Sequence, residues 1–217
     1  MNFVAAGLLT RQTKGFPSVL RLGLTGGIAS GKSAVAAMLR DMGFPVLSAD
    51  LASHKLMEPG QPAHDEILQA FGPTIVAADG QIDRAKLAAL VFADAAKLTL
   101  LNAILHPRVE KIMLQQFEDW QRSGIRDAGF VEAALLVEVG FDKHLDGLVV
   151  AWCEPNQQLE RLRARGMSEI DARRRLAAQM PVEEKRKRAT YLIDCSRTIA
   201  ETLAQVCALA AKLRRPH

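Results

Sequence analysis

The feature that most constrains this chain is the segment Gly26-Gly-Ile-Ala-Ser-Gly-Lys-Ser33, which matches the pattern G-x-x-x-x-G-K-[S/T]. It follows the apolar run Val19–Thr25, which is typical of a buried parallel strand, and precedes apolar residues at helical spacing up to Met42. Glycines let consecutive backbone N–H groups turn toward an anion, and the N-terminal end of a helix adds its positive dipole. The segment therefore predicts a phosphate-binding loop between a strand and a helix.

The side chains of this loop predict a nucleoside triphosphate as the ligand. Lys32 places a mobile positive charge near the β- and γ-phosphates, and the Ser33 hydroxyl is expected to bind a Mg²⁺ ion that bridges them. The alternative is a glycine turn that only joins strand to helix, but it gives lysine and serine no packing reason to be there. The predicted nucleotide contacts are Gly26, Gly27, Ile28, Ala29, Ser30, Gly31, Lys32, Ser33 and Ala34.

The rest of the chain alternates strand-like and helix-like segments, which predicts an α/β fold with a parallel sheet flanked by helices. Further strands are expected at 45–48, 129–133, 147–152 and 191–194. Asp83 and His106-Pro107 resemble helix starts. Helices are expected at 33–42, 62–71, 83–92, 94–105, 107–122, 156–166, 168–180, 182–189 and 199–213.

Composition excludes several classes of protein. With 49% hydrophobic and 24% charged residues among 217, the chain is typical of a soluble globular protein with a full apolar core. Its apolar runs are shorter than the roughly 18 residues that a membrane helix needs. Three cysteines without a Cys-x-x-Cys pair favour a reducing compartment over disulfides or zinc. The net charge of +4 favours anionic partners.

Residues 1–20 are expected to be an unstructured extension. An apolar run precedes Arg11 and Lys14, whereas a secretory signal places its basic residues first. An organelle-directing presequence is the alternative.

A second acidic group follows the strand at 45–48. Asp50 lies where the carboxyl ends of parallel strands face the phosphate loop, so its carboxylate is placed to accept the proton of a substrate hydroxyl or to orient that hydroxyl. The alternative is a cap for a helix over Leu51–Met57. Chemistry alone leaves both roles open.

With these motifs in order, the chain from about Leu22 to Glu201 resembles the dephospho-CoA kinase family. The resemblance implies transfer of the ATP γ-phosphate to the ribose 3′-hydroxyl of dephospho-CoA by a P-loop kinase with a parallel sheet flanked by helices. It also implies, within residues 21–217, a helical CoA-binding insertion at about 58–123 and a helical lid at about 156–189. The matching segments are Leu24–Ser33, Ser48–Asp50, Glu58–Gly60, Phe71-Gly72, Asp83-Arg84, Leu101-Asn102, Ile104, His106-Pro107, Val109, Gln179–Pro181 and Lys185.

The resemblance also implies roles for single residues. It makes Asp50 the group that activates or orients the hydroxyl. In the lid, Arg161 and Arg165 stand four residues apart and so share one helix face, from which a guanidinium can reach the transferring phosphate oxygens when the lid closes. We expect Arg165 to contact the transferring phosphate and Arg161 to contact the nucleotide, while most of the lid arginines form a solvated surface. His106 is either a substrate contact or a turn residue before a helix-starting proline.

Three positions depart from the family pattern. Glu132 stands where the family commonly has aspartate, in Glu132-Ala-Ala-Leu-Leu-Val-Glu138, which lacks the usual proline; we expect Glu132 to hold Mg²⁺ through water. Ala34 replaces a frequent threonine and removes a hydrogen bond to the α-phosphate, so weaker ATP binding is conceivable. Cys195 replaces the usual asparagine.

Two rival functions remain at this point. One is another P-loop enzyme, although the Asn-Lys-x-Asp stretch of GTPases is absent. The other is a basic nucleic-acid-binding or scaffold protein, favoured by Lys185-Arg-Lys-Arg188 but lacking interleaved aromatic residues. We expect a cytoplasmic enzyme that uses ATP, Mg²⁺ and dephospho-CoA, with no nucleic-acid or membrane partner; the sequence leaves its oligomeric state open.

Overall fold

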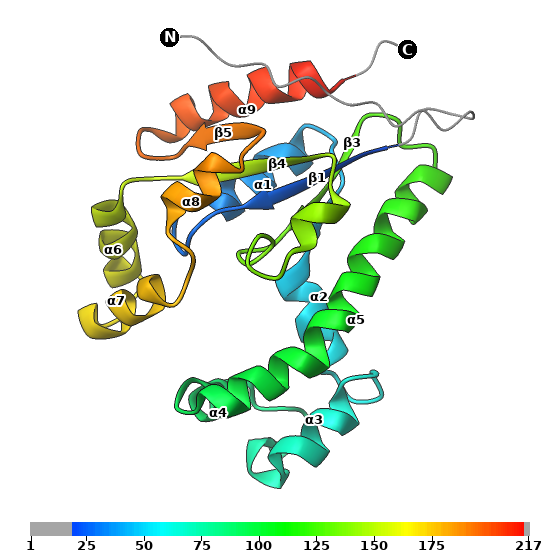
Figure 1. Cartoon of the computed structure of the whole chain (residues 1–217), viewed down its shortest axis with the longest axis vertical. Helices are drawn as coiled ribbons and strands as arrows, with labels where there is room; N and C mark the ends of the chain where they lie inside the picture. The colour runs from blue at the N-terminus through cyan, green and yellow to red at the C-terminus, as the bar shows by residue number, and fades with distance from the viewer. Residues whose placement is uncertain (1–18, 215–217) are drawn as a thin grey trace. The chain divides into compact units, whose positions relative to one another are not determined.

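The computed structural model describes residues 19–214, and within them the strands form one five-stranded sheet in the order β2-β3-β1-β4-β5 (Figure 1). The strands are β1 (Leu20–Thr25), β2 (Val46–Ser48), β3 (Ala128–Glu132), β4 (Gly147–Trp152) and β5 (Tyr191–Asp194). β1 pairs in parallel with both β3 and β4, and β4 pairs in parallel with β5. The predicted parallel sheet is thus confirmed, whereas the predicted extension over residues 1–20 lies, except for Val19 and Leu20, outside the described residues.

The chain divides into two compact units. The first comprises the described parts of residues 1–46 and 119–217 and contains the phosphate loop. The second comprises Leu47–Glu118 and contains Asp50 and His106. Each unit has its own buried residues.

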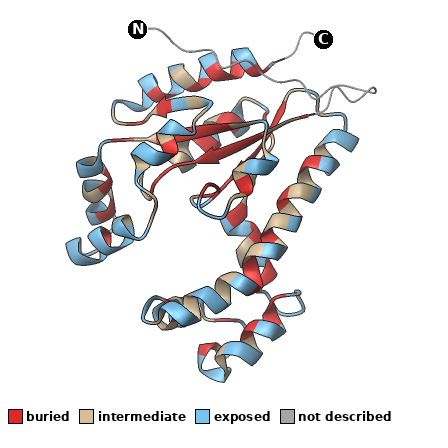
Figure 2. Ribbon diagram, in the orientation of Figure 1, coloured by how far each residue is buried: buried red, intermediate tan, exposed pale blue. Residues whose placement is uncertain are grey.

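The core of the first unit lies between the sheet and helices α1 (Lys32–Asp41) and α9 (Ile199–Leu213). Figure 2 shows the central strands as largely buried, as expected for apolar strands covered by helices. Val35 and Leu39 of α1 and Val206 and Leu209 of α9 join the strand residues in one apolar cluster. This packing fixes the start of α1, where the phosphate loop ends.

Three short helices follow β4 in the region expected to form the lid. They are α6 (Pro155–Ala164), α7 (Glu169–Ala177) and α8 (Val182–Lys187), and α6 and α7 lie side by side in Figure 1. α6 begins with a capping box between Glu154 and Gln157, and Pro155 occupies its first position, where a missing N–H costs nothing. Gly166, in the left-handed region at φ 82°, turns the chain into α7.

The second unit is helical, as its pattern predicted. It contains α2 (Ala49–Leu56), α3 (His64–Phe71), a short 3₁₀ helix (Pro73–Ile75), α4 (Arg84–Phe92) and most of α5 (Ala95–Arg122). Asp83 caps α4 as predicted, because its carboxylate accepts hydrogen bonds from the Ala85 and Lys86 N–H groups.

The prediction of two helices at 94–105 and 107–122 was wrong. α5 is one helix of 28 residues that continues through Pro107. Proline removes one backbone hydrogen bond, but the buried side chains Leu105, Val109, Met113 and Phe117 recur every four residues on both sides of it. Burial of this continuous apolar stripe outweighs the local penalty. Despite this length, no helix within residues 19–214 is long and apolar enough to cross a membrane.

Candidate active site

The phosphate loop has the strand–loop–helix setting that its sequence predicted. Gly31, with φ 103°, is the N-cap of α1, so Lys32 is the first residue of the helix. A Cβ at Gly31 would lie 2.7 Å from the Cβ of Cys195, and one at Gly26 would overlap the backbone of Ala151. Both glycines are therefore required by space, and Gly31 is required by its backbone conformation as well. Ala29 also lies in the left-handed region, with φ 58°.

An acidic side chain from β3 meets the end of this loop. The Glu132 Oε1 atom lies 2.9 Å from the Nζ of Lys32 and 3.5 Å from the Oγ of Ser33. Glu132 is the last residue of β3, next to Leu24 of β1, and is 6% exposed. Its second oxygen lies 3.6 Å from the NH2 of Arg40. A buried carboxylate is thus balanced by two cations beside the loop that is expected to hold phosphate.

Of the two lid arginines singled out by sequence, Arg161 reaches the loop. Its NH1 donates to the Ala29 carbonyl oxygen at 3.2 Å and its NH2 donates to the Cys195 carbonyl oxygen at 2.6 Å. The helix expected over 156–166 ends at Ala164, and Arg165 lies exposed at its C-cap. Among residues 19–214, the structure gives the Arg165 guanidinium no acidic partner.

Two glutamines that sequence reasoning did not assign to the site also contact the loop. Gln158 Nε2 donates to the Ile28 carbonyl oxygen at 2.8 Å, and Gln179 Oε1 accepts from the Ile28 N–H at 2.8 Å. Gln179 belongs to a segment that matched the family, but its role was not apparent. No local sequence pattern indicates that Gln158 contacts the loop, because its partner Ile28 lies 130 residues away in sequence.

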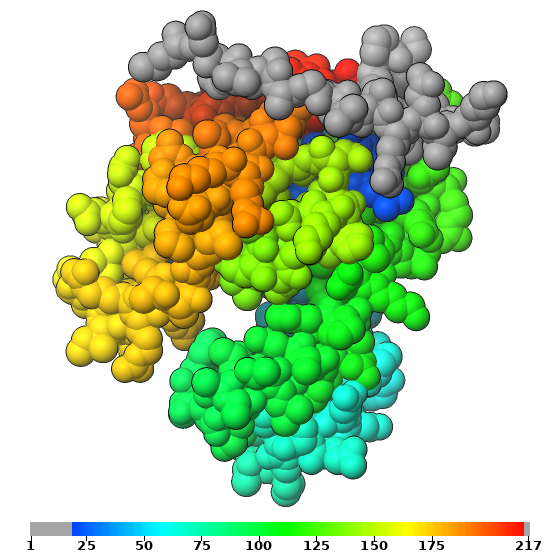
Figure 3. Space-filling view, in the orientation of Figure 1, coloured from blue at the N-terminus to red at the C-terminus, as the bar shows by residue number. Residues whose placement is uncertain are grey.

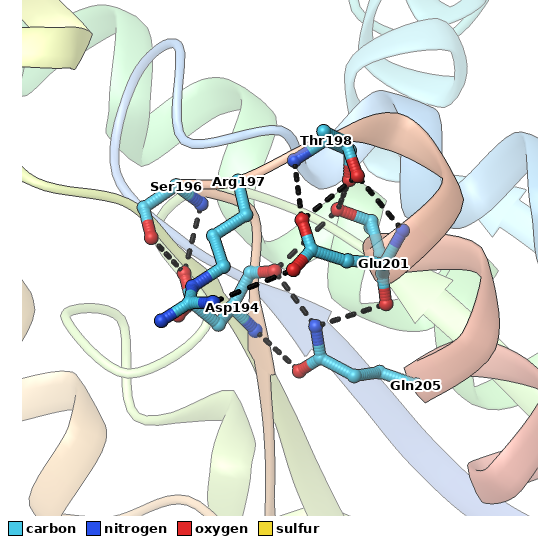
Figure 4. A network of polar contacts seen from close by, with 7 residues as sticks. Asp194, Ser196, Arg197, Thr198, Glu201 and Gln205 are labelled. Atoms are coloured by element: carbon cyan, nitrogen blue, oxygen red, sulfur yellow. Dashed lines mark hydrogen bonds and ion pairs between the residues drawn. The ribbon is translucent and has the colours of Figure 1, made fainter.

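The loop after β5 is held by a network of polar contacts (Figure 4). Asp194 accepts hydrogen bonds from the Ser196 N–H, at 2.8 Å, and from the Ser196 hydroxyl. Gln205 bonds to both backbone groups of Asp194, at 2.9 Å each, and Thr198 and Glu201 form the capping box of α9. These contacts fix Cys195, whose carbonyl oxygen binds Arg161. Burial raises the pKa of the Cys195 thiol to about 11, so the thiol stays protonated.

In the second unit, the helix-cap alternative for Asp50 was wrong. Ser48 is the N-cap of α2 and accepts from the Leu51 N–H, whereas Asp50 lies exposed in the first turn. One turn later, the Nδ1 of His54 lies 2.7 Å from the NH1 of Arg84. Burial and the Arg84 charge lower the pKa of His54, and Asp50 opposes this effect.

His106 does not precede a helix, so the turn alternative for it was also wrong. It lies half-buried within α5, where burial lowers the pKa of its imidazole. The neutral ring is therefore favoured near neutral pH.

A known protein family matches most of this chain. The family described as Dephospho-CoA kinase matches residues 20–201. The chain belongs to the dephospho-CoA kinase family. It is 44% identical over 191 residues to the dephospho-CoA kinase of Geobacillus kaustophilus, covering 88% of this chain and 94% of that protein.

Solved structures support the dephospho-CoA kinase fold. TT1252 from Thermus thermophilus has a TM-score of 0.78 at 35% identity, over 91% of this chain and all (100%) of that one. The dephospho-CoA kinase from Campylobacter jejuni has a TM-score of 0.63 at 24% identity, over 89% of this chain and 96% of that one, which supports the fold alone.

In this member of the dephospho-CoA kinase family, the basic cluster Lys185–Arg188 is engaged in ion pairs. Lys185 is fully buried and pairs with Glu138 at 2.8 Å. Arg186 pairs with Glu183 and lies over the Trp152 ring, Lys187 pairs with Glu184, and Arg188 pairs with Asp142. Each member of the cluster therefore has an acidic partner within the chain.

Proposed function

We propose that this chain transfers the γ-phosphoryl group of Mg²⁺-bound ATP to the ribose 3′-hydroxyl of dephospho-CoA, and that Lys32, Glu132 and Asp50 carry the reaction. One observation carries this proposal. At the end of the phosphate loop, Oε1 of the buried Glu132 lies 2.9 Å from the Nζ of Lys32 and 3.5 Å from the Oγ of Ser33. A kinase needs a cation and oxygen ligands together at this point. Backbone N–H groups of the loop from Gly26 to Ala34 hold the phosphates, except for the Ile28 N–H, which is bonded to Gln179.

The residues beside Lys32 fit a magnesium ion. Ser33 and Glu132 offer hydroxyl and carboxylate oxygens 3.5 Å apart, which are the ligand types that Mg²⁺ prefers. Mg²⁺ usually keeps several waters and binds through one or two protein oxygens together with the substrate phosphates. When bound, Mg²⁺ neutralises charge on the β- and γ-phosphates.

Asp50 is assigned to the acceptor hydroxyl. The 3′-oxygen of the ribose forms a bond to the γ-phosphorus, the bond from that phosphorus to the β,γ-bridging oxygen breaks, and ADP leaves with the bonding electrons. Asp50 accepts or directs the proton of the hydroxyl. Lys32 compensates negative charge on the phosphate oxygens, and Arg165 is assigned to the same oxygens when the lid closes.

The helical insertion at about 58–123 is assigned to the CoA part of the substrate, with His106 as a contact. The region at about 156–189 is assigned as the lid that excludes water and suppresses ATP hydrolysis. We place the enzyme in the cytoplasm, because the three cysteines are free thiols and a reducing compartment keeps them so.

The test is an assay of the purified chain with ATP, Mg²⁺ and dephospho-CoA, read by mass spectrometry for CoA and ADP in equal amounts. Lys32→Ala should lose most turnover, about 10²–10³-fold, because it removes stabilisation of developing charge. Lys212→Ala, at an exposed position of α9, is the matched control and should keep the wild-type rate. Absence of CoA from folded protein that binds ATP would overturn the proposal.

A further inference from the structure

A glutamine from the lid region is bonded to the middle of the phosphate loop. Gln179 Oε1 accepts from the Ile28 N–H at 2.8 Å, across 151 residues of sequence. Gln179 lies just after α7, and it is half-buried. A hydrogen bond from a loop N–H group to a side-chain amide oxygen fixes the orientation of that peptide group.

The same loop residue is bonded on its other side. Gln158, which is 5% exposed, donates to the Ile28 carbonyl oxygen at 2.8 Å, so side chains bond both backbone groups of Ile28. The next carbonyl, of Ala29, accepts from Arg161 at 3.2 Å. Ala29 has a φ of 58°, a conformation that is unfavourable for a non-glycine residue and persists only where its surroundings hold it. The three side chains supply that support.

Gln179 is itself held in place by an ion pair between the fully buried Lys185 and the more exposed Glu138. The N–H of Met180 donates to Glu138 Oε1 at 3.2 Å, and the same oxygen lies 2.8 Å from the Nζ of Lys185. Lys185 also donates to the Ala134 carbonyl oxygen at 2.6 Å, which accepts from the Thr25 hydroxyl at 3.1 Å. Thr25 directly precedes the phosphate loop. In Figure 3 the orange atoms of α8 adjoin the yellow-green atoms of residues 133–146, where these contacts lie.

A fully buried lysine is costly unless it is paired and hydrogen-bonded, and Lys185 is both. Its partners come from the segment after β3, whereas Lys185 itself comes from α8. The ion pair therefore joins the residues that follow Gln179 to the residues that follow Glu132. The position of Gln179 relative to the loop depends on this junction.

We propose that Gln179 is a positioning residue: through its bond to the Ile28 N–H, and anchored by the Lys185–Glu138 pair, it holds the phosphate loop in the conformation that binds ATP. This role rests on the proposed function, since it assumes that ATP binds at the loop. Because the loop holds the phosphates in both the ground state and the transition state, loss of Gln179 weakens ATP binding more than it slows turnover.

The first test measures amide hydrogen exchange at Ile28 in the nucleotide-free chain. Gln179→Met removes the acceptor at similar side-chain length, and exchange should accelerate about 10-fold. Gln179→Glu keeps an acceptor oxygen and should retain the protection. Gln121→Met, at an exposed position of α5, is the matched control. Unchanged exchange in Gln179→Met, or loss of protection in Gln179→Glu, would overturn the assignment.

The second test is kinetic. In Gln179→Met the KM for ATP should rise about 5–10-fold, with kcat and the KM for dephospho-CoA within about twofold of wild type. An unchanged KM for ATP contradicts the proposal, and so does an equal rise of both KM values. A lower KM for ATP would mean that Gln179 only occupies the place of a phosphate oxygen, and would also overturn it.

The anchor is tested by removing both charges together, because substitution of Glu138 alone leaves the buried Lys185 charge without its partner. The double variant Lys185→Met/Glu138→Met should raise the KM for ATP, as Gln179→Met does. The triple variant that also carries Gln179→Met should have the same KM for ATP as the double variant. Additive effects would contradict the anchoring role. Should wild-type protein make no CoA, the proposed function fails, whereas the exchange experiment on the nucleotide-free chain still decides the role of Gln179.

Discussion

The Nζ of Lys32 lies 2.9 Å from Oε1 of Glu132, and both side chains are almost fully buried. The pair joins the first residue of α1 to the last residue of β3, which are 100 residues apart in sequence. The carboxylate that holds this lysine beside the phosphate loop also lies 3.5 Å from the Ser33 hydroxyl. In the proposed reaction, Lys32 therefore serves the nucleotide and Glu132 serves the metal.

Glu132→Gln should lower kcat about 10–100-fold and raise the Mg²⁺ concentration needed for half-maximal rate, because the amide has lost the charge that attracts the hydrated ion. Turnover is measured across a Mg²⁺ titration. Glu118→Gln, an exposed change on α5, serves as the control. A wild-type Mg²⁺ requirement in Glu132→Gln would remove Glu132 from the metal site.

Asp50→Asn should lower kcat about 10²–10⁴-fold while leaving the KM for ATP within about twofold, since an amide does not accept the hydroxyl proton. Steady-state kinetics with both substrates provide the measurement. Asp41→Asn, at the exposed end of α1, is the matched change. Retention of the wild-type rate in Asp50→Asn would show that another group activates the hydroxyl.

Gly27 and Gln158 should be energetically coupled, because a Cβ at Gly27 would overlap the Gln158 amide. Gly27→Ala should cost about 1–2 kcal/mol of unfolding free energy by displacing that amide from the Ile28 carbonyl oxygen. In Gln158→Ala the clash is absent, so the double variant should be no less stable than Gln158→Ala alone. Urea unfolding of the three variants measures the coupling; strictly additive losses would contradict the geometry.

The stability of the chain should fall as the medium becomes acidic, in part through His106. Burial holds the pKa of His106 below its ordinary value of 6.5, so the unfolded chain takes up the proton first as pH falls. This contribution is fully present above 6.5 and is lost as pH falls below it. When Tm is measured from about pH 8 to about pH 5.5, the Tm of His106→Gln should fall less steeply with decreasing pH than that of the wild type. An unchanged slope would assign the acid sensitivity to other groups.

Cysteine reactivity should separate the buried thiols from the exposed one. Burial raises the pKa of Cys153 and raises that of Cys195 to about 11, whereas Cys207 is exposed. Since the thiolate is the reactive form, iodoacetamide at about pH 8 should label Cys207 first and the other two only after unfolding. Mass spectrometry of the labelled peptides checks this order, and equal labelling of Cys195 in the folded chain would disprove it.

Local pattern was enough for much of the fold. The strands at 147–152 and 191–194 and the helix at 199–213 have the predicted bounds, because apolar periodicity and turn residues are local properties. Pro107 was misread as a helix start, since burial of side chains on both sides of it is a property of the folded unit. The cap of α2 was assigned to Asp50 as one alternative, but Ser48 occupies it.

By itself, the sequence determined the phosphate loop and its ligand, because glycine spacing, lysine and serine lie within eight consecutive residues, Gly26–Ser33. Only the tertiary structure decided which distant side chains support that loop. Glu132, Gln158 and Gln179 reach it from 100 to 151 residues away, through hydrogen bonds that form once the sheet and its helices have packed. Such contacts depend on where the backbone places each side chain in space, and no local pattern records that placement.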